Sequence, residues 1–124
     1  MVATAERIDF ISHNIVFEQG SPGPIPIAGR STLTVNFRVF RRGPAHVSGL
    51  IYTTNFWIRP QTALAQFQSF EGDNELWRAI VIESSNAFNQ RVSFEYVIFC
   101  DDHRGNSEVE KIYNTNNGET FRIQ

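Results

Sequence analysis

The stretch Thr32-Leu-Thr-Val-Asn-Phe-Arg-Val39 decides the fold class of this chain. Apolar residues at 33, 35, 37 and 39 alternate with polar or charged residues at the even positions. Successive side chains of a β-strand point to opposite faces, so this two-residue period is that of a strand with one buried face. The stretch therefore predicts a half-buried β-strand, which the breaker pair Gly43-Pro44 brings to an end.

Further short extended stretches lie on both sides of this strand, at 8–17, 47–52, 76–82, 91–100, 109–113 and 120–123. Residues 62–70 are ambiguous, because Ala63-Leu-Ala65 would also suit a short helix. The segment Gly20–Gly29 is rich in proline and glycine and is expected to be a connecting loop or an irregular edge. Together, the pattern predicts an all-β fold, an immunoglobulin-like antiparallel β-sandwich of seven or eight strands.

The overall composition limits the class of protein. The 124 residues suit one domain, 1–124, and 41% hydrophobic residues can supply its core. A formal net charge of −2 disfavours nucleic acid as a partner, and no apolar run reaches membrane-spanning length. The lone Cys100 and the lack of a visible signal peptide lead us to expect a cytoplasmic protein, unless the chain is a fragment of a larger secreted one.

Two segments place aromatic residues beside amides, Tyr52–Trp57 and Tyr113–Gly118. A flat aromatic face can stack on the apolar C–H face of a sugar ring, and an amide can both donate to and accept from sugar hydroxyls. Each segment also has a simpler interpretation. Trp57 could cap the sandwich core, and an asparagine-rich stretch suits a turn between two strands. Composition alone leaves both interpretations open.

These segments belong to a series of motifs that resembles carbohydrate-binding module family 21. The motifs lie in the family's order from about Ser31 to Ile123: Tyr52-Thr-Thr-Asn-Phe-Trp57, Ala65-Gln-Phe67, Glu75-Leu-Trp77, Val92-Ser-Phe94, and Tyr113-Asn-Thr-Asn-Asn-Gly118 followed by Phe121-Arg-Ile123. The family includes the starch-binding domain of fungal glucoamylases and the glycogen-targeting subunits of protein phosphatase 1. The resemblance implies non-catalytic binding of an α-glucan such as starch or glycogen.

The resemblance also implies site residues. Trp57 and Tyr113 fall on the family's stacking positions, and Asn116 and Asn117 fall on its Asn-Asn pair. Asn55 and Asn114 lie within the same motifs, and Asn114, Asn116 and Asn117 are expected to orient sugar hydroxyls. A possible second site takes in Phe40, Arg42, Phe67 and Glu75. The implied partner is an oligo- or polysaccharide, and self-association would add binding sites for a polymer. No cofactor or metal is predicted.

Three alternatives remain to be weighed. The domain could bind a different sugar as a stand-alone lectin. It could also target protein phosphatase 1, since Arg91-Val-Ser-Phe94 spells the Arg-Val-x-Phe docking pattern, but the motif lies in a predicted core strand and docking needs an accessible one. An enzyme is disfavoured because His13, His46 and His103 are scattered and the carboxylates Glu71, Asp73, Glu75 and Glu83 surround a turn. Asp101-Asp-His103 is expected to be a polar turn rather than a metal site.

Overall fold

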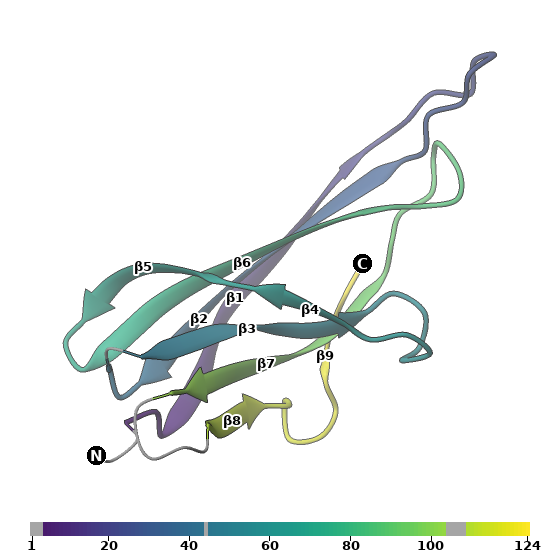
Figure 1. The fold of residues 1–124 in the computed structure, drawn as a ribbon. Coiled ribbons are helices and arrows are strands. Elements are labelled where there is room, and N and C mark those ends of the chain that lie inside the picture. Colours follow the sequence, from purple (N-terminus) through teal and green to yellow (C-terminus); the bar gives the residue numbers. More distant parts are fainter. Residues whose placement is uncertain (1–3, 44, 104–108) are drawn as a thin grey trace.

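The computed structural model describes residues 4–43, 45–103 and 109–124, which form a sandwich of two antiparallel sheets (Figure 1). The first sheet has the order β1-β2-β6-β5, made of Arg7–Glu18, Arg30–Phe40, Asn74–Ser84 and Gln66–Glu71. The second has the order β4-β3-β7-β8, made of Gln61–Leu64, His46–Thr53, Phe94–Asp102 and Glu110–Asn114, and β9 (Phe121–Ile123) also pairs with β7. The predicted all-β sandwich is confirmed, with nine strands in the described residues instead of seven or eight.

The additional strand comes from the ambiguous stretch at 62–70, which contains no helix. It forms β4 in the second sheet and β5 in the first, on either side of Ala65, whose amide donates to the carbonyl of Ser48 at 2.8 Å. The chain thus passes from one sheet to the other within a single extended run. Edge strands that change sheets in this way help to close the side of a sandwich.

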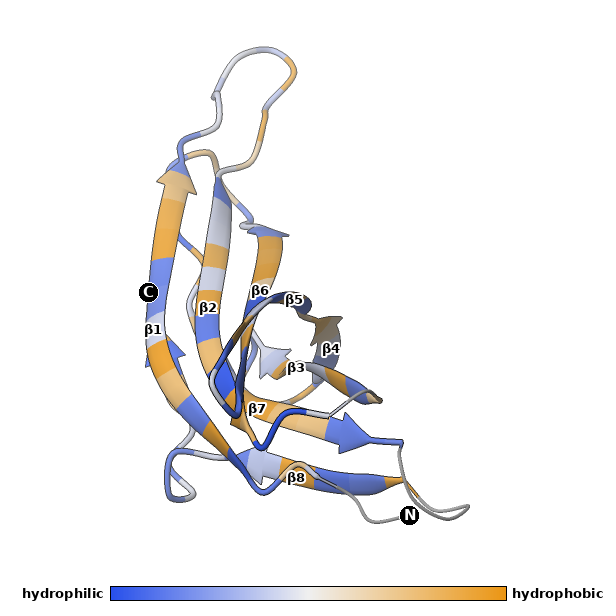
Figure 2. Cartoon of the chain, turned by 90° about the vertical axis from the view of Figure 1, so that its left-hand side faces the viewer, coloured by the Kyte–Doolittle hydropathy of each residue, from blue (hydrophilic) through white to orange (hydrophobic). Residues whose placement is uncertain are grey.

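The core lies between the two sheets and follows the predicted alternation, visible as alternating bands along β2 in Figure 2. Every odd position of β2 from Ser31 to Val39 is fully buried. The first sheet supplies Ile8, Leu33, Val35, Phe37, Val39, Trp77, Ala79 and Val81, and the second supplies Leu50, Tyr52, Phe94, Tyr96, Ile98, Cys100 and Phe121. Burial of these apolar side chains from two facing sheets is the main stabilising term of such a fold.

One edge of β7 is shared by two strands, and this arrangement positions the candidate site. Strand β8 pairs with residues 98–102 of β7, and β9 pairs with residues 94–96 of the same strand. Residues 115–120 therefore loop out between Asn114 and Phe121, opposite the middle of β7. The strand itself begins at Phe94, three residues later than predicted, because β9 begins its pairing there.

The loop between β1 and β2 projects away from the two sheets, as Figure 1 shows at the upper right. Its base is fastened by hydrogen bonds from the amide of Gly20 to the carbonyl of Phe88 and from the amide of Gly29 to the carbonyl of Ala87. Among the residues that the structure describes, no helix is long and apolar enough to cross a membrane.

Candidate functional site

A tight turn follows β3 and presents two aromatic residues. Thr53 is 1% exposed, and its hydroxyl oxygen accepts hydrogen bonds from the amides of Asn55 and Trp57, both at 3.1 Å. The same hydroxyl donates to Oδ1 of Asn55 at 2.8 Å. These bonds hold Phe56 and Trp57 in the left-handed region, with φ of 58° and 64°. Bulky residues adopt this conformation only where the surrounding structure imposes it.

A second strained turn is the loop between β8 and β9. Asn116, Asn117 and Gly118 are consecutive left-handed residues, with φ of 55°, 57° and 86°. The carbonyl of Thr115 accepts from the amides of Gly118 and Thr120, and the Asn116 side chain donates to the carbonyl of Thr120 at 2.9 Å. In the described part of the chain, these two turns contain all the non-glycine residues with positive φ. Strain of this kind gathers at functional sites.

Glu95, on the outward face of β7, connects the two turns. Its Oε2 accepts a hydrogen bond from the indole Nε1 of Trp57 at 2.7 Å and another from the Thr120 hydroxyl at 2.8 Å. Arg122 Nε lies 3.7 Å from the same oxygen. The hydrogen bond from Trp57 is the largest of the effects that lower the pKa of Glu95, followed by the one from Thr120. Glu95 is therefore held as a carboxylate that fixes the orientation of the indole ring.

The two turns enclose a surface hollow, the Trp57 hollow, whose lining is Trp57, Glu95, Asn116, Gly118, Glu119, Thr120 and Arg122. One aromatic side chain therefore stands among carboxylates, an amide, a hydroxyl and a guanidinium. Such a set can stack on one flat apolar face and exchange several hydrogen bonds with hydroxyl groups. It suits a small, uncharged, hydroxyl-rich ligand better than a purely apolar one.

The structure brings together only some of the predicted site residues. Trp57 and Asn116 line the same hollow. Tyr113 is exposed on β8 opposite Phe99, four positions along β7 from Glu95, so it lies on the same outer face but outside the lining. The exposed Asn117 lies in the second turn, next to Asn116.

The side chains of Asn114 and Asn55 make structural hydrogen bonds that the sequence did not predict. The Asn114 side chain donates to the carbonyl of Ile8 at 2.8 Å and accepts from the amide of Asn116, so it ties β1 to the second turn. Both ends of the Asn114 amide are therefore engaged within the protein, and its role in binding a sugar stays a prediction. Asn55 caps the first turn through Oδ1, which also accepts from the amide of Arg59, and it lines a different hollow from Trp57.

The predicted second site is not assembled as one surface. Glu75 is 2% exposed and faces the interior, where it accepts from the amide of Gly43 and the indole of Trp77, so it cannot meet a ligand. Phe40 lies on the opposite face of the first sheet, under the guanidinium of Arg7 at 4.4 Å.

Arg42 and Phe67 do share a cluster with the exposed Phe70. The Arg42 guanidinium lies 4.3 Å from the Phe70 ring centroid, and the rings of Phe67 and Phe70 are 4.9 Å apart. The patch therefore consists of Arg42, Phe67 and Phe70. Of the four residues predicted for the second site, Phe40 and Glu75 lie outside it.

Sequence reasoning overlooked Glu95, Thr120 and Arg122, although all three line the hollow. A signal was present for Glu95, which is the only charged residue in the otherwise apolar or aromatic run from Phe94 to Cys100. A charge that interrupts a core strand normally has a partner. Which partner it has could not be read locally, because Trp57 is 38 residues away.

A buried polar cluster around His46 was also overlooked. His46 Nδ1 lies 2.6 Å from Oε1 of Glu75, and its Nε2 lies 3.2 Å from Oδ2 of Asp102, with all three side chains almost fully buried. Both ring nitrogens are thus occupied within the protein. No group of three His, Cys, Asp or Glu residues suited to a metal ion occurs among residues 4–43, 45–103 and 109–124.

The docking motif Arg91–Phe94 is incorporated into the fold. Val92 and Phe94 are 8% and 2% exposed and belong to the core, and the amide of Val92 donates to the Ser31 hydroxyl. Arg91 lies over the Phe17 ring at 4.9 Å. Docking through this motif would require the local structure to open.

A scan against models of known protein families and a search of curated proteins both find no match for this chain. The class that its own geometry defines is an antiparallel β-sandwich with a preformed hollow, lined by an aromatic residue and polar groups, on the outer face of one sheet. No particular family follows from these findings.

Proposed function

We propose that this domain is a non-catalytic carbohydrate-binding module whose ligand is an α-glucan of the starch or glycogen type. The observation that carries the proposal is the meeting of Trp57 and the Asn116–Thr120 turn around a single hollow, with Glu95 bonded to both. The α-glucan assignment itself rests on the resemblance of the motifs to carbohydrate-binding module family 21.

The chemistry of the hollow supports a sugar as the ligand. The indole of Trp57 offers a flat apolar surface, and its N–H is already engaged by Glu95, which limits rotation of the ring. Oε2 of Glu95 makes the contacts with Trp57, Thr120 and Arg122, and no hydrogen bond from a described residue reaches Oε1, which can accept from a ligand hydroxyl. Asn116 and Glu119 add further polar groups along the rim.

The lowered pKa of Glu95 argues against the general-acid role of a glycosidase for this residue. Glycosidases need one carboxylic acid whose pKa is raised, so that it can protonate the leaving oxygen. Glu95 is shifted in the opposite direction, chiefly by the hydrogen bond from Trp57. It is therefore suited to a fixed acceptor and not to a general acid.

Affinity at this one hollow should be modest. Each hydrogen bond to a sugar hydroxyl replaces one to water and contributes only about 0.5–1.5 kcal/mol. Dissociation constants on the order of micromolar to millimolar are expected for a single site. Retention on a polymer would then depend on repeated sites, either along the glucan or through self-association of the domain.

The experiment is a titration with maltoheptaose and β-cyclodextrin, followed by tryptophan fluorescence and by calorimetry. We expect saturable binding that Trp57→Ala removes while the variant keeps its thermal unfolding transition. Ile82→Ala, which removes an exposed apolar side chain from β6 in the other sheet, is the control and should bind normally.

Three results would contradict the proposal. Absence of binding to either glucan would remove the α-glucan assignment, and a glycan array would then test the alternative of a lectin for a different sugar. Unfolding of Trp57→Ala would show that Trp57 acts in the core instead of at a site. Release of reducing sugar from starch would overturn the non-catalytic assignment.

A further inference from the structure

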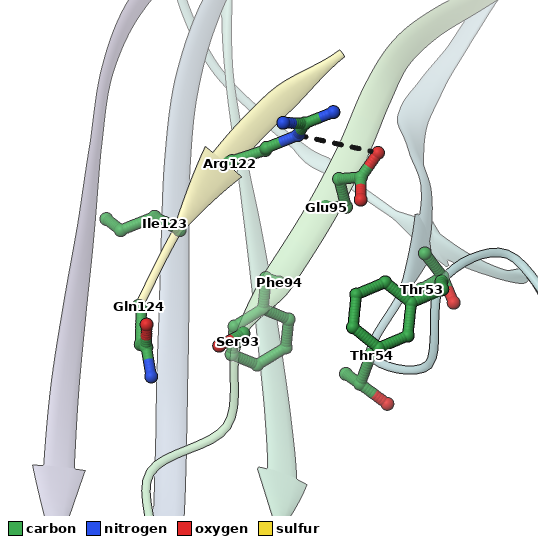
Figure 3. Close-up of a pocket in the computed structure, with 9 residues that line it drawn as sticks. Thr53, Thr54, Ser93, Phe94, Glu95, Arg122, Ile123 and Gln124 are labelled. Carbon is green, nitrogen blue, oxygen red and sulfur yellow. Dashed lines mark ion pairs between the residues drawn. The ribbon is translucent and has the colours of Figure 1, made fainter.

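The Trp57 hollow is one part of a longer depression. A second hollow, the middle hollow, lies between the turn after β3 and the end of β9, with Ser93 and Phe94 beside it (Figure 3). Glu95 and Arg122 line both the Trp57 hollow and the middle hollow. Their ion pair, drawn as a dashed line in Figure 3, therefore forms the shared wall of two neighbouring depressions.

The middle hollow continues into a third depression, which we name the amide groove. Thr54, Phe56, Ser93 and Gln124 line both of them. The amide groove adds polar side chains from the loops at 84–93 and 54–56: Asn55, Ser84, Asn86, Asn89 and Gln90. Three depressions that share walls in this way form one elongated surface across the end of the sandwich.

The lining of the amide groove indicates the chemistry of its ligand. Carboxamides and hydroxyls donate and accept hydrogen bonds, and the lining contains no Asp or Glu side chain. Its one charged residue is Arg91, whose guanidinium lies over the Phe17 ring. A neutral ligand with many hydroxyl groups fits this lining better than a polyanion or a polycation.

Phe56 supplies the aromatic surface for this half of the depression. Its side chain is 89% exposed and its φ is 58°, so the chain holds a strained, bulky residue where burial brings no compensation. The Thr53 hydroxyl, through its bonds to the amides of Asn55 and Trp57, maintains that conformation. Phe56 and Trp57 are thus adjacent in sequence but line different hollows.

We propose that the three depressions bind one saccharide chain across several consecutive sugar units, with Trp57 and Phe56 as two separate stacking positions and the amide groove as the far end. This inference rests on the proposed function and adds the length of the ligand to it. The domain would then recognise an oligosaccharide segment rather than a single terminal sugar.

The test compares maltose with maltoheptaose by calorimetry for the unmodified chain, Phe56→Ala and Ile58→Ala. Ile58 is 81% exposed in the same turn and lines none of the three depressions, so its variant is the matched control. Phe56→Ala should lower the affinity for maltoheptaose roughly 3- to 10-fold and leave the affinity for maltose unchanged. The double variant Asn86→Ala, Asn89→Ala should likewise lower the ratio of the affinity for maltoheptaose to the affinity for maltose.

Because a long chain can bind in several overlapping registers, the ratio of the two affinities is compared between variants and not judged in the unmodified chain alone. The inference is overturned if the ratio is the same in Phe56→Ala and Ile58→Ala while Trp57→Ala still removes binding, because the Trp57 hollow would then act by itself. If neither maltose nor maltoheptaose binds, the proposed function and this inference fail together.

Discussion

The indole nitrogen of Trp57, in the turn after β3, donates a 2.7 Å hydrogen bond to Oε2 of Glu95 in β7. Thr120 donates to the same oxygen at 2.8 Å. One carboxylate on β7 therefore fixes the turn after β3 and the turn before β9 relative to each other. The shape of the Trp57 hollow depends on this connection.

The first prediction concerns Glu95 as a positioning residue. Glu95→Ala should weaken maltoheptaose binding by roughly 5-fold, because Trp57 and Thr120 both lose their acceptor. Glu95→Gln keeps an acceptor oxygen and should retain most of the affinity. Calorimetry measures both. Equal losses in the two variants would mean that the charge of Glu95 matters and not its hydrogen bonds.

The second prediction concerns Phe121, which is buried at the start of β9. Its ring stacks on Phe10 at 4.8 Å and on Tyr96 at 5.2 Å, and it directly follows the strained Thr120. Phe121→Ala should lower the free energy of unfolding by about 3–5 kcal/mol, as measured by urea titration. It should also weaken sugar binding well below its melting temperature, because the end of the second turn loses its anchor. Full affinity in the Phe121→Ala variant would mean that the conformation of the second turn does not depend on the packing of Phe121.

The third prediction concerns pH and the buried His46 cluster. Burial by itself would lower the pKa of His46, but the hydrogen bond and charge of Glu75, together with Asp102, outweigh it and raise the pKa. Burial by itself would raise the pKa of Glu75, but hydrogen bonds from His46, the Gly43 amide and Trp77 bring it below its usual value.

The directions of these two pKa shifts predict that the free energy of unfolding has a maximum as a function of pH. The His46 contribution is complete below the ordinary histidine pKa of about 6.5 and is lost as the pH rises through the raised value. The Glu75 contribution is complete above the ordinary glutamate pKa of about 4.3 and is lost as the pH falls through the lowered value. Urea unfolding should therefore show the greatest free energy of unfolding between about pH 4.3 and pH 6.5.

Variants at His46 check that assignment. His46→Gln keeps a donor but cannot titrate, so the decline in stability on the alkaline side should flatten. His46→Ala removes the ring that contacts both buried carboxylates, Glu75 and Asp102, and should lower the free energy of unfolding by about 3 kcal/mol. If the loss of stability at alkaline pH persists in His46→Gln, a group other than His46 causes it.

The fourth prediction concerns Cys100, which is completely buried in β7. Burial is the main cause that raises the pKa of its thiol to about 12. Since the thiolate is the reactive form, the folded protein should not react with a disulfide reagent at pH 8, and one thiol should appear in guanidinium chloride. Rapid labelling of the folded protein would show that β7 opens locally.

Much of the fold was predictable because alternation is a local property. The residues from Thr32 to Val39 show which side chains turn inward without reference to any other strand, and the structure buries the predicted ones. The stretch at 62–70 could not be assigned in this way, since its division into β4 and β5 depends on which sheet each half pairs with. The start of β7 at Phe94 depends similarly on its pairing with Ile123.

The sequence by itself determined the class of fold, the inward faces of its main strands and the two turns rich in aromatic and amide groups. Only the tertiary structure decided that Glu75 turns inward, that Asn114 is bound to the backbone of β1, and that Glu95 joins Trp57 to Thr120. The physical reason is distance along the chain. Periodicity predicts on which face of its own strand a side chain lies. The partner of a buried or bridging polar group, in contrast, comes from a segment tens of residues away.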